Sequence, residues 1–316
     1  MGSDAYVTPL IGKIIKPLTI LLILVSPLFF FGGPDYFSPR LLQEAWNLGH
    51  FLFFGIFALL LDNHWCEKQR SILFRFSACC LVLFFVGLSI ELIQIAVPGR
   101  SFTWIDLFRD VSGGLAFLSW KISSSVSSTQ TTFYRTAAFF ILLVNCIPLG
   151  RMGLDEYRAR RDFPLLSGFE NSSELSRWNG GAELSQSDSV SLQGKYSGMM
   201  RLTTEKYSGI SLRHFQGDWS GRNGLTFSIF NPGAEITLHY RVHDSAHRGD
   251  MQAYSNRFNG KAVLSGGWTT ITIPMADILT GPRNRPMDLT HIEGFGVFVI
   301  RQNERRVLYI DDVRLF

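Results

Sequence analysis

The sequence predicts a helical membrane bundle of about five spans followed by an all-β jelly-roll sandwich. Residues up to about 150 are dominated by Leu, Phe and Ile, whereas the rest of the 316-residue chain is rich in Ser, Gly, Arg, Asp and Asn. In this second part, turn-forming clusters separate short runs of alternating apolar and polar residues, a pattern typical of sandwich strands. We therefore expect a membrane domain over 1–150, a charged connector over 151–165 and an extracytoplasmic jelly roll over 166–316.

Five apolar segments account for the predicted spans. A helix needs roughly 20 apolar residues to cross a bilayer, and the first and third segments reach that length without their polar ends. The first segment ends in "FFFGGPDYF" without a small-residue cleavage site, so we expect an uncleaved anchor. The five segments are residues 10–31, 46–61, 76–97, 104–120 and 137–149.

The basic residues near these segments predict the orientation. Cytoplasmic loops carry an excess of Lys and Arg, which favours a cytoplasmic N-terminus in a bacterial plasma membrane and places the polar half outside. The Arg residues that follow the fifth segment argue for the opposite orientation. On the N-terminal side lie Lys13, Lys16, Lys68, Arg70, Arg75, Lys121 and Arg135, and on the other side Arg40, Arg100 and Arg109.

Polar residues recur at the outer ends of the second, third and fourth segments. Ionisable side chains are costly in a bilayer and mark functional sites by default. Three interpretations stay open: interhelical hydrogen bonds that hold the bundle, a ligand site in which Arg100 binds a phosphate or carboxylate, and an acid/base set of His50, Glu91 and Asp106. The full cluster is His50, Glu91, Gln94, Arg100, Asp106 and Asp110.

The stretches "HFLFFGIFALLL", "ELIQIAVPGRS" and "IDLFRDVSGG" carry a resemblance to the VanZ-like family of bacterial membrane proteins over residues 46–120. That family has a His-Phe pair, Glu-x-x-Gln, Arg-Ser after a proline, an Asp and a glycine-bearing helix. The chain departs from the residues usual in the family at Asn47, Thr103 and Asp110. The family is named for a protein that lowers susceptibility to a glycopeptide antibiotic, so the resemblance implies a role in the cell envelope and glycopeptide resistance.

The stretches "SGFEN", "GKYSGMMRL", "GGWTTITIPM" and "LYIDDVRLF" resemble the galactose-binding-like jelly rolls of many carbohydrate-binding modules, over residues 166–316. Such domains often carry a structural calcium near their chain ends. The resemblance implies Glu170 and Asp311 as ligands, joined by carbonyl oxygens of the "GKYSG" turn, and hard oxygen ligands suit calcium. The alternative is that both are ordinary exposed carboxylates.

The segment "HYRVHDSAHRGDMQAYSNRFNGK" is the richest polar stretch of the second half. Strand alternation places His239, Arg241 and His243 on one side. Sugars are bound by flat aromatic faces ringed by planar polar groups, so we expect a glycan groove here; a zinc site on its histidines lacks a fixed geometry. Trp178, Trp219 and Trp268 are expected in the core. The predicted groove residues are Arg241, His243, Asp244, Tyr254, Asn256 and Arg257.

These observations predict a membrane protein that recognises an envelope glycan, lipid-linked sugar or glycopeptide, with membrane lipid and that glycan as partners. Two alternatives stay open: a membrane-embedded hydrolase or transferase acting on a lipid-linked envelope precursor, and a scaffold that binds envelope-assembly proteins of an exopolysaccharide complex. The basic residues are scattered, which argues against nucleic acid. Cys66, Cys79, Cys80 and Cys146 all lie in the first half and form no disulfide framework.

Overall fold

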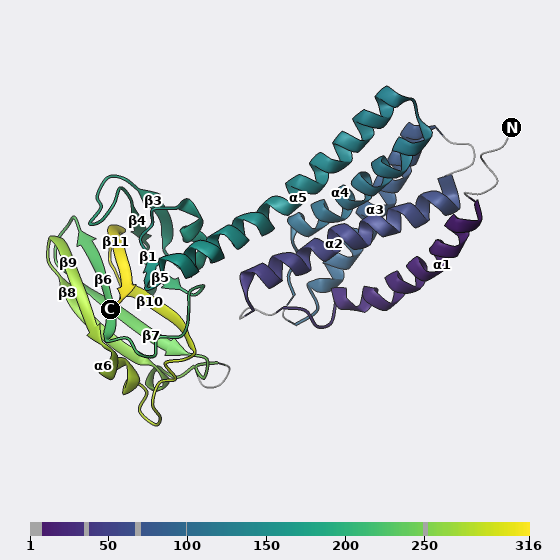
Figure 1. The fold of residues 1–316 in the computed structure, drawn as a ribbon. Helices are drawn as coiled ribbons and strands as arrows, with labels where there is room; N and C mark the ends of the chain where they lie inside the picture. The colour runs from purple at the N-terminus through teal and green to yellow at the C-terminus, as the bar shows by residue number, and fades with distance from the viewer. Residues whose placement is uncertain (1–7, 35–37, 67–70, 99, 249–251) are drawn as a thin grey trace. The chain divides into compact units, whose positions relative to one another are not determined.

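The computed structural model of the protein describes residues 8–34, 38–66, 71–98, 100–248 and 252–316. The chain divides into two compact units, Met1–Gly150 and Arg151–Phe316 (Figure 1). The first unit is helical and the second is a sandwich of two antiparallel sheets. The fold class predicted from the sequence is therefore confirmed.

Side-chain caps begin two of the helices of the first unit. The Ser71 hydroxyl accepts the amide N–H of Phe74 at 3.3 Å, and the Thr103 hydroxyl accepts that of Asp106 at 3.1 Å; such caps satisfy amides that have no partner inside the helix. The helices are α1 (Thr8–Val25), α2 (Arg40–Leu61), α3 (Ile72–Gln94), α4 (Trp104–Ile122) and α5 (Ser128–Asp162), with short turns at Ser26–Phe29, Asp62–Cys66 and Ser123–Ser125.

Two adjacent glycines of α4 set its distance to the neighbouring helices. A Cβ atom on Gly113 would lie 2.1 Å from the carbonyl oxygen of Phe51 on α2, and one on Gly114 would lie 2.0 Å from the Leu83 side chain on α3. Small residues at helix interfaces allow this close approach in membranes. The small residues of this segment therefore bring α2 and α4 into contact.

All five predicted apolar segments are helical. Within the residues that the structure describes, three helical stretches are long and apolar enough to cross a membrane: Arg40–His64, Ile72–Gln94 and Ser128–Asp162. The first segment forms a shorter apolar helix over Lys16–Phe29. Helix α4 is more polar, because its first two turns carry Asp106, Arg109 and Asp110.

A buried carboxylate also joins three helices at the other end of α2. Asp62 is fully buried and pairs with Arg75 of α3 at 2.6 Å and with Lys121 of α4 at 2.9 Å. Both cations come from helix ends, so this ion-paired group fixes the end of the bundle that lies away from His50.

Helix α5 continues through most of the segment expected as a connector, since it ends at Asp162. Its last turns belong to the second unit. There the Asp155 carboxylate accepts hydrogen bonds from Arg177 at 2.8 and 2.9 Å and from Ser173 at 2.9 Å. Asp155 is 1% exposed and Arg177 is 4% exposed. The sandwich unit is therefore incomplete without residues 151–162.

The sandwich has one sheet in the order β3-β4-β11-β6-β9, with β1 added to β11, and a second in the order β2-β5-β10-β7-β8. The alternating runs of the sequence, which are "GMMRLTT", "GLTFSIFN", "AEITLHYRVHD", "WTTITIPM", "GFGVFVIRQ" and "RVLYIDDVRLF", correspond to β4, β6, β7, β9, β10 and β11. The strands are β1 (Leu165–Ser167), β2 (Trp178–Gly180), β3 (Glu183–Ser187), β4 (Ser197–Leu202), β5 (Tyr207–Leu212), β6 (Gly224–Asn231), β7 (Ile236–Asp244), β8 (Phe258–Leu264), β9 (Gly267–Pro274), β10 (Ile292–Ile300) and β11 (Arg306–Leu315), with a short helix α6 (Met275–Leu279).

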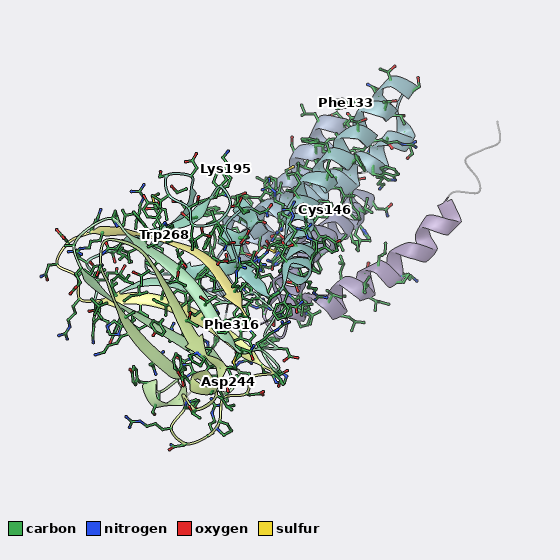
Figure 2. The ribbon with its side chains drawn as sticks, turned by 60° about the vertical axis from the view of Figure 1, so that its left-hand side comes forward. Phe133, Cys146, Lys195, Asp244, Trp268 and Phe316 are labelled. Atoms are coloured by element: carbon green, nitrogen blue, oxygen red, sulfur yellow. The ribbon has the colours of Figure 1, made fainter. Side chains whose placement is uncertain are left out.

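One hydrophobic core fills the space between the two sheets. Phe227 and Phe295 are fully buried, with their ring centroids 4.9 Å apart. Trp178 and Trp219 lie in this core, as predicted. Trp268, labelled in Figure 2, is only half-buried. It packs on Phe230 on the outer face of the six-stranded sheet, with the ring centroids 5.4 Å apart.

Candidate functional site

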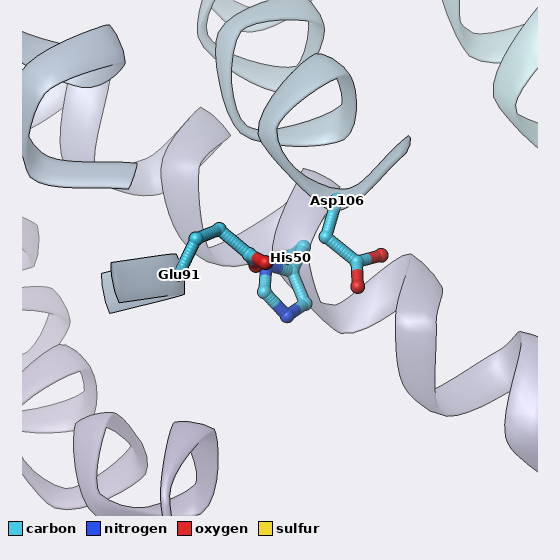
Figure 3. Close-up of side chains that lie close together, drawn as sticks. All are labelled: His50, Glu91 and Asp106. Atoms are coloured by element: carbon cyan, nitrogen blue, oxygen red, sulfur yellow. The ribbon is translucent and has the colours of Figure 1, made fainter. Parts of the chain in front are cut away.

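Three helices bring four of the predicted polar residues of the helical unit together. His50 comes from α2, Glu91 from the last turn of α3, and Asp106 and Asp110 from α4. Nδ1 of His50 lies 2.9 Å from Oδ1 of Asp110. Figure 3 shows the carboxylates of Glu91 and Asp106 near the His50 imidazole, and one ligand atom from each of these three residues lies within 4.8 Å of the others.

Burial makes this cluster electrostatically demanding. Glu91 and Asp110 are fully buried and His50 is 7% exposed. Oε2 of Glu91 accepts the amide N–H of Thr103 at 2.7 Å. Its other oxygen, Oε1, is buried without a hydrogen-bond partner among the described residues, as is Oδ2 of Asp110. The Asp106 side chain is 14% exposed, so it is the carboxylate of the cluster that reaches the surface.

Two further charged residues complete the cluster, and sequence reasoning missed their role. Nη1 of Arg109 donates to Asp106 at 3.1 Å, and Nη2 of the same guanidinium donates to Glu44 at 2.6 Å. The Thr103 hydroxyl also donates to Asp106, at 2.7 Å. A signal was present in the sequence, because Asp106 and Arg109 are three residues apart on one helix. Glu44 lies 65 residues from Arg109, and nothing in the sequence joins them.

Gln94 and Arg100 face a different partner, the segment that follows α1. The Gln94 side chain donates to the carbonyl oxygen of Phe29 at 2.8 Å. Nη2 of Arg100 donates to the carbonyl oxygens of Leu28 at 3.2 Å and Gly32 at 2.7 Å. Both side chains therefore bind backbone next to the cluster, and their contacts fix the loop between α1 and α2.

The second candidate site is the exposed face of the five-stranded sheet. Its central strand β10 carries Gly294 and Gly296 at outward positions. A Cβ atom on Gly294 would meet the His243 ring at 2.1 Å, and one on Gly296 would lie 3.2 Å from Nε of Arg241. The cross-strand register pairs each glycine with that same residue. The imidazole and the guanidinium therefore lie over backbone that has no side chain.

Aromatic side chains continue this face along β10. The His239 and Phe298 rings are stacked, with centroids 5.5 Å apart and planes 22° apart. A cavity of about 600 Å³ begins beside His239 and is also lined by Thr237, Ile300 and Arg301, and at its far side by Glu235 and Glu304. The outward residues that the register pairs across β5, β10, β7 and β8 include no carboxylate; they are Tyr207, Gly209, Ser211, Gly294, Gly296, Phe298, Ile300, Thr237, His239, Arg241, His243, Asn259, Lys261 and Val263. Glu293, at the bulge of β10, is ion-paired with Arg248.

Two histidines meet at one end of this face. The His243 and His247 rings are 5.1 Å apart, and Nδ1 of each is buried without a hydrogen-bond partner among the described residues. Burial lowers the pKa of His243 to about 3, with further lowering by His247, Arg241, Arg213 and Arg257 nearby. His243 is therefore neutral at physiological pH.

The other predicted groove residues divide into two groups. Tyr254 is 67% exposed, and the Arg257 guanidinium lies over its ring at 5.5 Å. Asp244, labelled in Figure 2, is instead fully buried and is ion-paired with Arg285. Asn256 accepts a hydrogen bond from Arg285 at 2.8 Å. Asp244 and Asn256 thus hold Arg285, while Tyr254 and Arg257 are placed at the surface.

The two predicted calcium ligands lie beside the same turn. Oε1 of Glu170 accepts the amide N–H groups of Lys195 and Tyr196, at 2.9 and 3.0 Å. Oδ2 of Asp311 accepts those of Leu192 and Gln193, at 2.8 and 3.1 Å. The turn therefore presents amide donors to these oxygens. Calcium at Glu170 and Asp311 stays a prediction.

Comparison with known proteins places the two units separately. The VanZ/LLP1 family model matches residues 13–123. This range covers α2, α3 and α4 and includes every residue of the polar cluster. This match and the apolar helices identify the first unit as a membrane domain. No curated protein sequence matches the chain.

The solved structures that are similar to the chain cover its C-terminal half. A family 11 carbohydrate-binding module from Clostridium thermocellum, in complex with a β-1,3-1,4-mixed-linked tetrasaccharide, is 19% identical, with a TM-score of 0.37, over 48% of this chain and 94% of that one. An exo-β-agarase is 16% identical, with a TM-score of 0.39, over 48% and 24%. A carbohydrate-binding module of the β-sandwich superfamily is 16% identical, with a TM-score of 0.34, over 48% and 61%.

Proposed function

We propose that this membrane protein, whose helical unit carries the VanZ/LLP1 match, binds an acidic glycan across the exposed face of its five-stranded sheet. The ligand belongs to the cell envelope: a surface glycan, a lipid-linked sugar or a glycopeptide. The helical unit anchors the binding unit at the membrane.

One observation carries this proposal: planar side chains lie over a glycine-bearing strand. His243 covers Gly294 and Arg241 lies beside Gly296, while Phe298 stacks on His239. Pyranose rings present flat apolar faces edged by hydroxyl groups. A surface that combines aromatic rings with guanidinium donors therefore supplies both the stacking contact and the hydrogen bonds that a sugar needs.

The charge of this face supports an acidic ligand. Arg241, Arg257 and Lys261 lie on or beside it, and its register-paired outward positions bear no carboxylate. Glu293, at the bulge of β10, is already neutralised by Arg248. Arg is well suited to carboxylate and phosphate, because its planar fork makes two parallel hydrogen bonds. A glycan with carboxylate, phosphate or sulfate groups is therefore favoured over a neutral one.

The topology that we propose has a cytoplasmic N-terminus and five crossings of a bacterial plasma membrane. Antiparallel crossings place the start of α2, the end of α3 and the start of α4 on the extracytoplasmic side, where α5 also ends. The basic residues of the cytoplasmic loops support this orientation. An extracytoplasmic sandwich is placed where envelope glycans are accessible.

The test is calorimetry on residues 151–316, a fragment that keeps the whole sandwich core and the Asp155–Arg177 ion pair. We expect binding to a polyuronate and weaker binding to a neutral glucan of equal length. Arg241→Ala should lower the affinity about 10- to 100-fold, because a hydrogen bond to a charged group contributes about 1.5–3 kcal/mol. The matched control is Arg201→Ala, on an exposed position of the other sheet.

A second variant distinguishes the two faces of the sandwich. Trp268 and Phe230 form an aromatic patch on the six-stranded sheet. Loss of binding in Trp268→Ala with full binding in Arg241→Ala would place the site on that sheet and contradict the proposal. A folded fragment that binds none of the polyuronate, the glucan or peptidoglycan fragments would contradict glycan recognition itself.

A further inference from the structure

We propose that His50, Glu91 and Asp106 of the helical unit bind a divalent transition-metal ion such as Zn²⁺ or Mn²⁺ (Figure 3). One ligand atom from each residue lies within 4.8 Å of the other two. In a tetrahedral site with bonds of about 2.0–2.2 Å, ligand atoms are about 3.4 Å apart. The three side chains project from three different helices, so each approaches the shared position from its own side.

The first independent support is an unsatisfied acceptor. Glu91 is fully buried, and its Oε1 has no hydrogen-bond partner among the described residues, while Oε2 is held by the Thr103 amide. A buried polar group without a partner costs about 1–3 kcal/mol, and more when it is charged. A cation between Glu91 and His50 supplies the missing partner.

The second support is the charge balance of the cluster. Four carboxylates gather here, those of Glu44, Glu91, Asp106 and Asp110. Arg109 contributes one positive charge, and Arg40, buried on α2 one turn before Glu44, contributes at most a second. With His50 neutral, as a metal ligand must be, and the four carboxylates ionised, at least two negative charges remain in excess, which a divalent cation neutralises.

The third support is the set of hydrogen bonds that neighbouring residues make to the ligand side chains. Asp110 lies 2.9 Å from Nδ1 of His50, which orients the imidazole and leaves the other ring nitrogen for the metal. Asp106 is held by the Thr103 hydroxyl and by Arg109. Carboxylates that hold a metal-binding histidine, and hydrogen bonds to the ligating carboxylates, are the usual second layer of such sites.

The ligand types select the class of metal. One imidazole nitrogen with two carboxylate oxygens suits zinc, manganese or iron, whereas magnesium and calcium favour oxygen alone. The Asp106 side chain is 14% exposed, so this ligand lies on the side of the cluster nearest the surface, from which an ion can enter.

The test uses the full-length protein, purified without an affinity tag in detergent, stripped with a chelator and titrated with ZnCl₂. We expect one zinc per chain by mass spectrometry after gel filtration, and a visible absorption spectrum when Co²⁺ replaces zinc. Glu91→Gln and His50→Ala should each lower the zinc affinity by about 100-fold or more. Even residues that only hydrogen-bond to metal ligands change the metal affinity by about 10- to 100-fold. The matched control, His64→Gln, changes a histidine bonded to the Leu60 carbonyl and should bind zinc as the unchanged protein does.

A variant of Asp106, the least buried of the three ligands, guards against a folding artefact. If Glu91→Gln or His50→Ala fails to elute as a single species, Asp106→Asn takes its place, with the same expected loss of zinc and of the cobalt spectrum. Unchanged protein that retains no zinc after gel filtration would overturn the proposal. So would equal zinc affinity in the unchanged protein and in the folded ligand variants.

Discussion

The pH dependence of the free energy of unfolding tests whether His243, on the exposed face of the five-stranded sheet, is buried and neutral. Burial lowers its pKa from 6.5 to about 3. A histidine with a lowered pKa in the folded state stabilises the protein fully above pH 6.5, and that stability is lost as the pH falls toward 3, because the unfolded chain binds the proton more readily. Between pH 7 and pH 5 the expected loss from this residue is about 2 kcal/mol.

The perturbation is His243→Gln, which keeps a planar polar group over Gly294 and removes the titration. Urea unfolding of residues 151–316 at pH 7, 6 and 5 gives the free energy of unfolding. The variant should lose about 2 kcal/mol less than the unchanged fragment between pH 7 and pH 5. The control is His291→Gln, on a side chain that is 68% exposed. Equal pH dependence in the fragment and in His243→Gln would refute the assignment of His243 as a buried neutral histidine.

Three further predictions follow from buried contacts. Arg177→Ala should cost residues 151–316 about 3–5 kcal/mol in urea unfolding, because a buried carboxylate loses its partner; Arg160→Ala, in an exposed pair, should cost less than about 1 kcal/mol. Gly113→Ala should destabilise the helical unit by about 1–3 kcal/mol in detergent melts through overpacking, whereas Gly150→Ala, with open space around it, should not. Calcium should raise the melting temperature of residues 151–316, and Asp311→Asn should abolish that rise; an unchanged melting temperature with calcium would dismiss the site.

The sequence predicts which residues of the helical cluster share a face of one helix. Glu91 and Gln94, and Asp106 and Asp110, share faces because they are three or four residues apart. The sequence does not predict, however, which residue each of these side chains contacts. Asp110 binds His50, Gln94 binds a backbone carbonyl, and Arg109 joins Asp106 to Glu44. These contacts depend on which helices are neighbours, and the packing of Gly113 and Gly114 decides that.

The sandwich face was predictable only along single strands. Alternation placed His239, Arg241 and His243 on one side of β7, but the glycines beneath them come from β10, more than 50 residues later. Asp244 shows the same limit. It lies within the polar stretch and ends β7, yet its place in the alternation is the inward one, and Arg285 meets it there across 41 residues. Strand register and long-range ion pairs are tertiary properties that a local pattern does not contain.

The glycines of β10 also affect how readily the sheet face takes up a ligand. Because His243 and Arg241 already rest on backbone at Gly294 and Gly296, their rotamers are restricted before any encounter. Ordering a flexible side chain on binding costs about 0.5–1.5 kcal/mol. Two side chains ordered in advance thus remove about 1–3 kcal/mol of entropic cost. Such a surface needs no rearrangement on contact, so its complexes should form by simple one-step association, with rates limited by diffusion and orientation.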